Sequence, residues 1–254
     1  MLNFTFAYQP ILDTVTGQAA SYEALVRGLA NETAGTVFSR VAPGGLHDFD
    51  TAARRRALMT AVRLGIACDL NLNLLPGSLE RADVELRRTI TAARLHGFPL
   101  TRLIVEISES EVITDPARLR EQLAAFRALG GRVAIDDFGA GHSGLSLLAD
   151  FQPDMVKLDR HLCHQIDLDP RRQAIVRALL RCCRELGCEV VAEGIERVEE
   201  LSWAMAEGVS LFQGFLFGQP GFERLLPVSK APVLAGADHA LPWLAEPHRH
   251  QALA

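Results

Sequence analysis

From about residue 68 onward, short β-like runs alternate with stretches of helical periodicity, and this alternation restricts the fold more than any other feature. Repeated β-then-α units favour a parallel sheet with helices packed outside it. A capping aspartate followed by proline, at Asp115 and again at Asp169, marks two helix starts, and Gly187 marks a helix end. We expect strands over Leu70–Leu74, Leu103–Ser108, Val133–Asp136, Met155–Leu158, Glu189–Ala192 and Val209–Phe212. We expect helices over Pro116–Leu129, Asp169–Leu186 and Val198–Glu207.

The opening of the chain departs from this pattern. Phe4–Tyr8 and Ala19–Leu25 have strand character, and the segment between them, which ends at Gly17, is typical of a hairpin turn. Together with the six later strands this makes eight, and eight strands in 254 residues favour an α/β fold, a TIM-like (β/α)8 barrel with an antiparallel opening strand. The alternative is an open doubly wound sheet, but no glycine-rich dinucleotide loop follows an early strand.

The composition fits a folded protein and excludes several classes. Hydrophobic residues make up 48% of the chain, and the net charge of −5 argues against a DNA-binding protein. An acidic protein can still bind a phosphate compound when metal ions supply positive charge. No apolar run approaches the roughly 18 residues of a membrane span, no signal-peptide pattern opens the chain, and the five cysteines lack CxxC spacing. We therefore expect a cytoplasmic protein with reduced thiols.

Polar side chains recur in one phase near the C-terminal ends of seven predicted strands. In Leu103–Ser108, for example, Leu103 and Val105 share an apolar face, which leaves Glu106 on the other face. Barrel strands alternate between the outer helices and the interior, and catalytic groups of barrel enzymes lie at the C-terminal ends. A single polar residue at a strand end is usually one that is exposed to solvent. Solvent exposure is a poor explanation for polar residues on the same face of seven strands. The inward set comprises Glu23, Asn73, Glu106, Asp136, Asp137, Lys157, Asp159, Glu193 and Gln213.

This set predicts a particular chemistry. Five carboxylates at one barrel mouth repel one another strongly unless cations offset their charge. No histidine or cysteine accompanies them, and oxygen ligands suit Mg²⁺, Mn²⁺ or Ca²⁺. Two such metals and a lysine suit hydrolysis of a phosphodiester, because the metals generate hydroxide and stabilise the leaving oxygen. Lys157 would orient the water or offset the charge of the phosphate. A salt bridge from Lys157 to Asp159 or Asp136 is the structural alternative.

A series of motifs runs along the chain in a fixed order, beginning with Glu23-Ala24-Leu25. The others are Tyr8-Gln9-Pro10-Ile11, Asn73, Glu106-Ile107-Ser108-Glu109, Asp136-Asp137-Phe138-Gly139-Ala140-Gly141, Lys157-Leu158-Asp159, Ala192-Glu193-Gly194-Ile195-Glu196 and Gln213-Gly214-Phe215. The series resembles the EAL-domain cyclic di-GMP phosphodiesterases over about residues 4–222. Residues Leu147–Asp154 are most similar to the EAL part of the blue-light-regulated members.

The resemblance implies hydrolysis of cyclic di-GMP to the linear dinucleotide pGpG in bacterial second-messenger signalling. It implies two divalent cations, Mg²⁺ or Mn²⁺, and a homodimer. We expect Ca²⁺ to inhibit, because its looser geometry suits in-line attack poorly. A separate sensor or regulator protein is one alternative for control, beside a stand-alone enzyme and a fragment of a longer protein. We expect residues 1–222 to form the EAL domain and residues 223–254 to form a tail that caps the barrel or is mobile. The implied metal ligands are Glu23, Asn73, Glu106, Asp136, Asp137 and Glu193, and the implied catalytic residues are Lys157, Glu23, Glu193, Asp136 and Asp137. The implied substrate contacts are Gln9, Leu25, Arg27, Asp159 and Gln213, and Glu109 and Glu196 are implied to anchor loops.

The chain departs from the family pattern in two places. Ala140, His142 and Gly144 stand where threonine, tyrosine and serine are usual, and Gly28 stands where tryptophan is common, so rate, regulation or substrate contacts could differ. A module that binds cyclic di-GMP or a partner protein without turnover is one alternative function, and a metal-dependent barrel lyase or aldolase is another. We interpret Arg54-Arg55-Arg56 as a solvated helix face, with a partner contact as its alternative.

Overall fold

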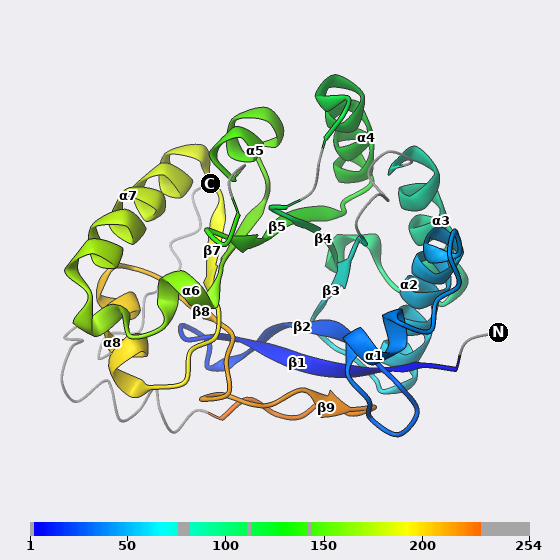
Figure 1. The fold of residues 1–254 in the computed structure, drawn as a ribbon, viewed down its shortest axis with the longest axis horizontal. Coiled ribbons are helices and arrows are strands. Elements are labelled where there is room, and N and C mark those ends of the chain that lie inside the picture. Colours follow the sequence, from blue (N-terminus) through cyan, green and yellow to red (C-terminus); the bar gives the residue numbers. More distant parts are fainter. Residues whose placement is uncertain (1–2, 76–81, 111–112, 142–143, 230–254) are drawn as a thin grey trace, which may run out of the picture.

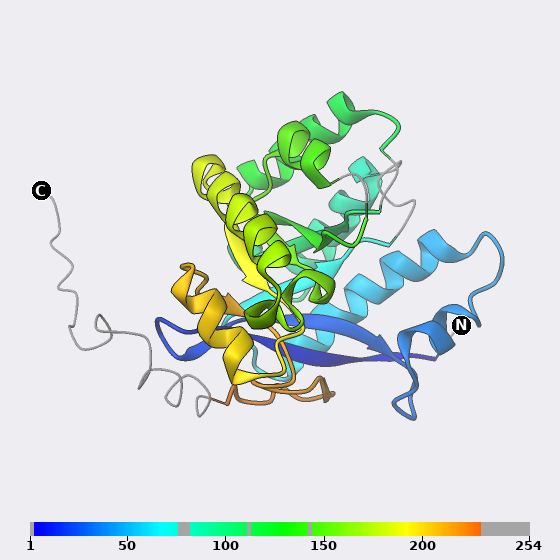
Figure 2. The ribbon, with the colours of Figure 1, turned by 60° about the vertical axis from the view of Figure 1, so that its left-hand side comes forward.

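The computed structural model describes residues 3–75, 82–110, 113–141 and 144–229. Its strands form a closed barrel with helices arranged around the outside (Figures 1 and 2). The strands are β1 (Thr5–Asp13), β2 (Gln18–Arg27), β3 (Asp69–Asn73), β4 (Leu103–Ser108), β5 (Arg132–Phe138), β6 (Met155–Leu158), β7 (Glu189–Ala192), β8 (Leu211–Phe212) and β9 (Gly221–Phe222).

The order of the strands confirms the barrel with an antiparallel opening strand. Strands β2 to β8 pair in parallel, each with the next along the chain. Strand β1 closes the barrel by pairing antiparallel with both β2 and β8. Strand β9, which the sequence pattern did not predict, pairs antiparallel with β1 at Ala7 and Tyr8.

The helices predicted from the sequence are α4 (Pro116–Ala128), α7 (Pro170–Leu186) and α8 (Val198–Ala206), and the structure confirms all three. Asp169 caps α7 by accepting the backbone N–H groups of Arg171 and Arg172, and Gly187 ends this helix with a φ of 73°. The remaining helices are α1 (Ala34–Phe38), α2 (Leu46–Arg63), α3 (Ala82–Leu95), α5 (Gly144–Phe151) and α6 (Arg160–Cys163). All five cysteines are free thiols, as expected.

The predicted solvated face at Arg54-Arg55-Arg56 is wrong for its first residue. Arg54 is only 3% exposed, because it lies on the face of α2 that packs against α3. There its guanidinium donates to Thr89 and pairs with Asp50 and Glu85. The burial of Arg54 is explained by partners that neutralise its charge, since a buried charge needs such partners.

The interior of the barrel is built in two layers. A small apolar cluster fills the bottom layer, which we call the floor; its members are Ile11, Ile104, Ala134, Met155, Val191 and Leu211. Because side chains alternate along a strand, the residue two positions further on lies on the same inner face. For β4 to β8 these residues are Glu106, Asp136, Lys157, Glu193 and Gln213. The floor thus seals the barrel directly below the polar residues that the sequence pattern singled out.

The described part of the predicted tail begins against the barrel. Tyr22 donates a hydrogen bond to the carbonyl oxygen of Leu226 at 2.8 Å, and the backbone N–H of Ser229 donates to Phe217 at 2.8 Å. Residues 230–254 lie outside the described residues, so a capping or mobile tail stays a prediction. No helix in the described part of the chain has both the length and the apolar character needed to cross a membrane.

Candidate active site

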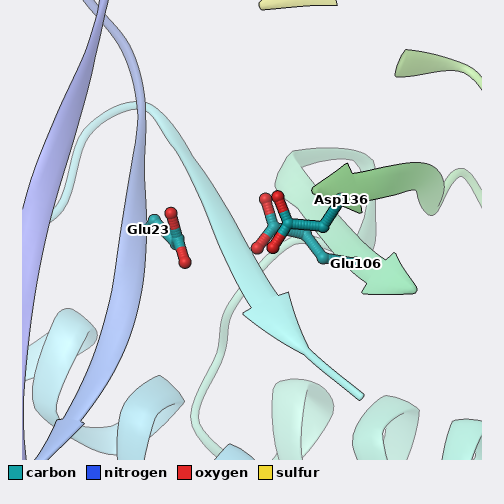
Figure 3. Close-up of side chains that lie close together, drawn as sticks. All are labelled: Glu23, Glu106 and Asp136. Carbon is teal, nitrogen blue, oxygen red and sulfur yellow. The ribbon is translucent and has the colours of Figure 1, made fainter. Parts of the chain in front are cut away.

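Lys157 on β6 lies at the centre of the inner polar layer. Its ammonium nitrogen is 3.1 Å from Glu23, 2.9 Å from Glu106 and 2.8 Å from both Asp136 and Glu193. Lys157 and Glu106 are completely buried. The carboxylates of Glu23, Glu106 and Asp136 point toward one another from three different strands (Figure 3). The structure therefore brings five of the predicted site residues into direct contact.

Amide side chains hydrogen-bond to these acids. Asn73 donates to Glu23 Oε1 at 3.1 Å, and Gln213 donates to Glu23 Oε2 at 2.8 Å. Asn71 donates to Glu106 Oε1 at 2.8 Å, a contact that the sequence pattern did not predict. The available signal was its position, two residues before Asn73 on the same strand face.

The charges in this cluster are unbalanced, because one ammonium faces four carboxylates. Burial raises the pKa of Glu106 to about 8, even though Lys157 pulls in the opposite direction. Burial also raises the pKa values of Asp136 and Glu193, and the neighbouring acids add to the effect. Burial acts in the same direction on Glu23, but Lys157 and the amide donors outweigh it and lower the pKa of that carboxyl. Bound cations would add the positive charge that all four acids need in order to ionise together.

Lys157 itself stays charged. Burial alone would lower the pKa of its amine, but the surrounding carboxylates outweigh burial and hold that pKa well above its usual value. The surrounding acids therefore favour the ammonium form of Lys157 over the neutral amine in this arrangement.

Two sets of carboxylates have the spacing of cation sites. One consists of Glu23, Glu106 and Asp136, and the other of Asp136, Asp137 and Glu193; within each set, one oxygen per residue lies within 4.8 Å of the others. Asp136 belongs to both sets. Glu106 Oε2 is buried and, within the described residues, has no hydrogen-bond partner, as expected for a lone pair that is left for a ligand. An all-oxygen donor set of this kind fits Mg²⁺, Mn²⁺ or Ca²⁺.

Asp136 and Asp137 both reach the barrel mouth although they are consecutive, whereas strict alternation would turn them to opposite faces. The pairing of β5 with β6 shifts register between Ile135 and Phe138, and Asp137 has a φ of 54°. Such an irregularity re-aims a side chain at the rim of a barrel. At the mouth, burial and the charge of Asp136 raise the pKa of Asp137 to about 6.

The loop after Asp137 is held by the buried carboxylate of Glu109. This carboxylate accepts the backbone N–H groups of Gly139, Gly141 and Gly144 at 2.8, 2.9 and 2.8 Å. A Cβ on Gly144 would lie 2.7 Å from Glu109 Oε1, so a larger residue there requires the anchor to shift. Glu109 thus holds the backbone of this loop, and Gly144 is one of the four residues that depart from the family pattern. His142 lies outside the described residues.

Two cavities meet at Asp136 and Asp137, which line both. The larger, of about 400 Å³, is also lined by Gln9, Glu23, Lys157, Asp159, Arg160, Glu193, Glu196, Gln213 and Phe215. The second, of about 290 Å³, is more apolar, and its lining includes Phe6, Leu25, Phe38, Leu72, Asn73 and Ser108. The acid cluster thus lies between two recesses, which could each receive half of an extended ligand.

Three other residues named from the sequence have additional contacts. Arg27 donates to the carbonyl oxygen of its neighbour Val26 at 2.7 Å. Asp159 caps α6 by accepting the backbone N–H of His161 at 2.7 Å. Glu196 lines the larger cavity and pairs with Arg160 at 3.2 Å.

A buried carboxylate that the sequence pattern did not single out, Glu200, accepts the backbone N–H of Glu196 at 3.0 Å. The signal for it was weak, since a glutamate in the first turn of a helix is common.

The fold and the site define a class, a (β/α) barrel with an all-oxygen cluster suited to divalent cations at its mouth. The sequence pattern of the EAL domain matches residues 2–220, and the chain therefore belongs to the EAL-domain family. This family generally consists of cyclic di-GMP phosphodiesterases, and the match supports a role in cyclic di-GMP signalling.

Similar proteins agree with this assignment. The blue light- and temperature-regulated antirepressor BluF of Escherichia coli (strain K12) is 31% identical over 219 residues, which cover 86% of this chain and 54% of BluF. The chain therefore spans about half the length of that relative. The probable cyclic di-GMP phosphodiesterase PdeN of the same organism is 28% identical over 260 residues, covering 98% of this chain and 46% of PdeN.

Solved structures share the whole barrel. A standalone versatile EAL protein from Vibrio cholerae O395, in its c-di-GMP bound form, has a TM-score of 0.84 and 40% identity, covering 91% of this chain and 98% of that chain. The manganese/cy-diGMP complex of Klebsiella pneumoniae BlrP1 has a TM-score of 0.84 and 38% identity, covering 89% of this chain and 58% of the BlrP1 chain. A calcium/cy-diGMP complex of BlrP1 has a TM-score of 0.82 and 37% identity, covering 89% of this chain and 59% of the BlrP1 chain.

Proposed function

We propose that this chain is a metal-dependent phosphodiesterase that hydrolyses cyclic di-GMP to pGpG. The observation that carries the proposal is the convergence of Glu23, Glu106, Asp136 and Glu193 on Lys157, within 3.1 Å of its ammonium. With Asp137, these acids form two overlapping carboxylate sets that share Asp136. Two sites that share a ligand fit a two-metal attack on a phosphodiester.

The residues divide the work between them. The two carboxylate sets, with Asn73 beside Glu23, would hold the cations. Divalent cations, when bound there, supply activation of water and neutralise the charge that develops on the phosphate. Lys157, fixed as an ammonium, orients the attacking water and offsets phosphate charge. Water attacks phosphorus in line and the bond from phosphorus to the 3′ oxygen breaks. One proton of the water ends on the released 3′ hydroxyl, and the cyclic dinucleotide becomes linear.

The two cavities support a dinucleotide substrate. Gln9, Asp159 and Gln213 line the larger cavity, and Leu25 lines the second. Phe215 at the larger cavity is 58% exposed and offers a flat apolar face on which a guanine can stack. Arg27 at the end of β2 is the proposed phosphate contact. A cyclic dinucleotide would then place one phosphate over the acids and one base in each recess.

The test begins with protein stripped of metal by a chelator. Incubation with cyclic di-GMP in Mg²⁺, in Mn²⁺ or without metal, followed by chromatography of the nucleotides, should give pGpG only where a metal is added. Glu23→Ala and Asp136→Asn should abolish turnover in either metal. Near-normal turnover in either variant contradicts the assignment, and tight binding without product favours a receptor instead.

Calcium should occupy the site and inhibit. Ca²⁺ accepts a looser geometry with more oxygen ligands than Mg²⁺, which suits in-line attack poorly. Titration of Ca²⁺ into the Mg²⁺ reaction should reduce the rate, whereas full turnover in Ca²⁺ alone would refute this part of the proposal.

The homodimer, the cytoplasmic location and a separate sensor or regulator protein belong to the same proposal. Sedimentation analysis with and without cyclic di-GMP tests the first of these.

A further inference from the structure

Glu200 is a completely buried carboxylate that lies outside the acid cluster. It belongs to the first turn of α8, and its two oxygens bind two different segments of the chain. Oε2 accepts the backbone N–H groups of Glu196 at 3.0 Å and Arg197 at 3.1 Å. Oε1 accepts the backbone N–H of Gln165 at 2.8 Å. His164 Nδ1 also lies 3.5 Å from Oε1, so the carboxylate of Glu200 has four protein groups close to it.

The first segment is the loop that follows β7 and Glu193. Glu193 is only three residues before Glu196, and the chain between them is tightly fixed. Gly194 has a φ of 64°, and a Cβ there would lie 2.3 Å from the side chain of Arg160. The backbone N–H of Ile195 donates to Gln213 at 3.1 Å, which ties this loop to the end of β8. Glu196 and Glu193 thus belong to one short loop whose backbone is restrained along its length.

The second segment is the turn that follows β6, the strand that carries Lys157. It runs through Asp159 and the short helix α6 to Gln165, where the φ of 53° places a non-glycine residue in the left-handed region. Such a conformation costs energy and persists only when its surroundings hold it. The hydrogen bond from Gln165 to Glu200 is one such restraint.

An ordinary helix cap does not explain this arrangement. A glutamate in the first turn of a helix often reaches back to the N–H of the capping residue, here Arg197. That role accounts for one of the three backbone bonds and for one oxygen. The other oxygen crosses to a different loop, 35 residues earlier in the chain. Burial opposes ionisation of Glu200, but the three donors outweigh it and lower the pKa of the carboxyl.

We propose that Glu200 is a positioning residue that fixes the loop bearing Glu193 against the turn that follows Lys157, and so completes the carboxylate set of Asp136, Asp137 and Glu193. This deepens the proposed function, on which its catalytic consequence rests. Glu109 does the equivalent for the loop after Asp137, also with three backbone donors. The two anchors hold the loops next to Asp137 and Glu193, which belong to the same carboxylate set.

The test compares Glu200→Ala with Glu200→Gln and with Glu199→Gln as the matched control. Glu199 is the neighbouring residue, and its side chain is 61% exposed. Binding of Mn²⁺ alone, followed by the paramagnetic resonance signal of the free ion, is the readout that does not depend on turnover. Loss of the groups that orient a metal ligand typically weakens metal affinity by about 10–100-fold. We expect Glu200→Ala to bind Mn²⁺ at least about 10-fold more weakly, Glu200→Gln to be intermediate, and Glu199→Gln to match the wild type.

Turnover separates positioning from a purely structural role. Glu200→Ala should lower kcat more than it raises KM, and the Gln variant should recover part of kcat. A fall in melting temperature with unchanged Mn²⁺ affinity and unchanged kcat overturns the proposal. If Glu200→Ala does not fold, a Glu200→Gln protein equal to the wild type in both measurements overturns it. A wild type that binds Mn²⁺ but does not hydrolyse cyclic di-GMP contradicts the proposed function and leaves the Mn²⁺ comparison decisive for Glu200.

Discussion

The two layers inside the barrel share strands β4 to β8 and face the same way, yet their chemistry is opposite. Met155 lies in the floor and Lys157 in the polar layer above it, two residues further along β6. Ile104 and Glu106 repeat the pattern on β4. The floor contains only apolar side chains, whereas the polar layer places four carboxylates around one ammonium.

This difference separates the side chains that stabilise the barrel from the side chains that we propose bind metal and take part in hydrolysis. A close-packed apolar layer contributes stability through buried area and needs no partner from solution. The polar layer has unequal charges, so its ionised form depends on an added cation. We therefore expect substitutions in the floor to change stability, and substitutions in the layer above to change metal binding and turnover.

The largest effect should come from Lys157→Met, which keeps the length of the side chain and removes its charge. Without the ammonium the attacking water loses its orienting donor, and we expect the rate of cyclic di-GMP hydrolysis to fall on the order of 10³-fold. Steady-state kinetics in saturating Mn²⁺ measures this. Lys157→Arg should also be strongly impaired, because a planar guanidinium does not replace a compact ammonium that faces four acids. A Lys157→Met enzyme within tenfold of the wild type removes Lys157 from the mechanism.

The next effect belongs to the floor. Ile104→Ala deletes buried methyl groups from a site only 1% exposed, and we expect it to lower the free energy of unfolding by about 3 kcal/mol. Urea denaturation followed by circular dichroism measures the loss. Hydrolysis per folded molecule should stay within about twofold of the wild type. A strong loss of kcat with little loss of stability would show that the two layers are not separable in this way.

Of the two layers, only the polar layer should make stability depend on pH. A carboxyl whose pKa is higher in the folded protein than in the unfolded chain adds stability below the unfolded value, and that stability is lost as pH rises through the folded value. For Glu106 this window runs from 4.5 to about 8, and for Asp137 from 3.8 to about 6. Glu23 has a lowered pKa and opposes the trend, but Asp136 and Glu193 reinforce it.

In chelator, the free energy of unfolding should therefore fall as pH rises from about 4.5 to about 8. Adding Mg²⁺ should reduce that fall, because bound cations favour the ionised acids. Glu106→Gln should flatten the curve in chelator, whereas Ile104→Ala should shift the curve down without changing its slope. Denaturation series at several pH values test this, and an unchanged slope in Glu106→Gln contradicts it.

Local patterns in the sequence predicted the polar layer, because strand alternation places residues two apart on one face. This rule correctly assigned Glu106, Lys157 and Glu193 to the inner face of the barrel. Alternation alone does not explain Asp137, which the sequence analysis included in the inward set; its position at the mouth depends on a register shift between β5 and β6. The rule also put Asn71 on the correct face without indicating its contact with Glu106.

Contacts between distant segments were beyond such patterns. The burial of Arg54 depends on Glu85, 31 residues away, and the role of Glu200 depends on Gln165, 35 residues away. Each looks like an ordinary helix residue from its neighbours alone. The sequence therefore predicts residues that face the barrel axis better than residues that hold the loops around it.

The smallest effect is expected at Met155, and it gives the sharpest form of the comparison. Met155→Leu conserves volume in the floor, where it is 4% exposed, and such exchanges usually cost less than about 1.5 kcal/mol. The matching conservative change in the polar layer, Lys157→Arg, keeps the charge but should remove most turnover. Melting temperature and hydrolysis rate, measured on both variants side by side, test the contrast. Met155 and Lys157 are two positions apart on one strand. A Met155→Leu enzyme with strongly reduced turnover would therefore mean that packing in the floor sets the position of the Lys157 ammonium.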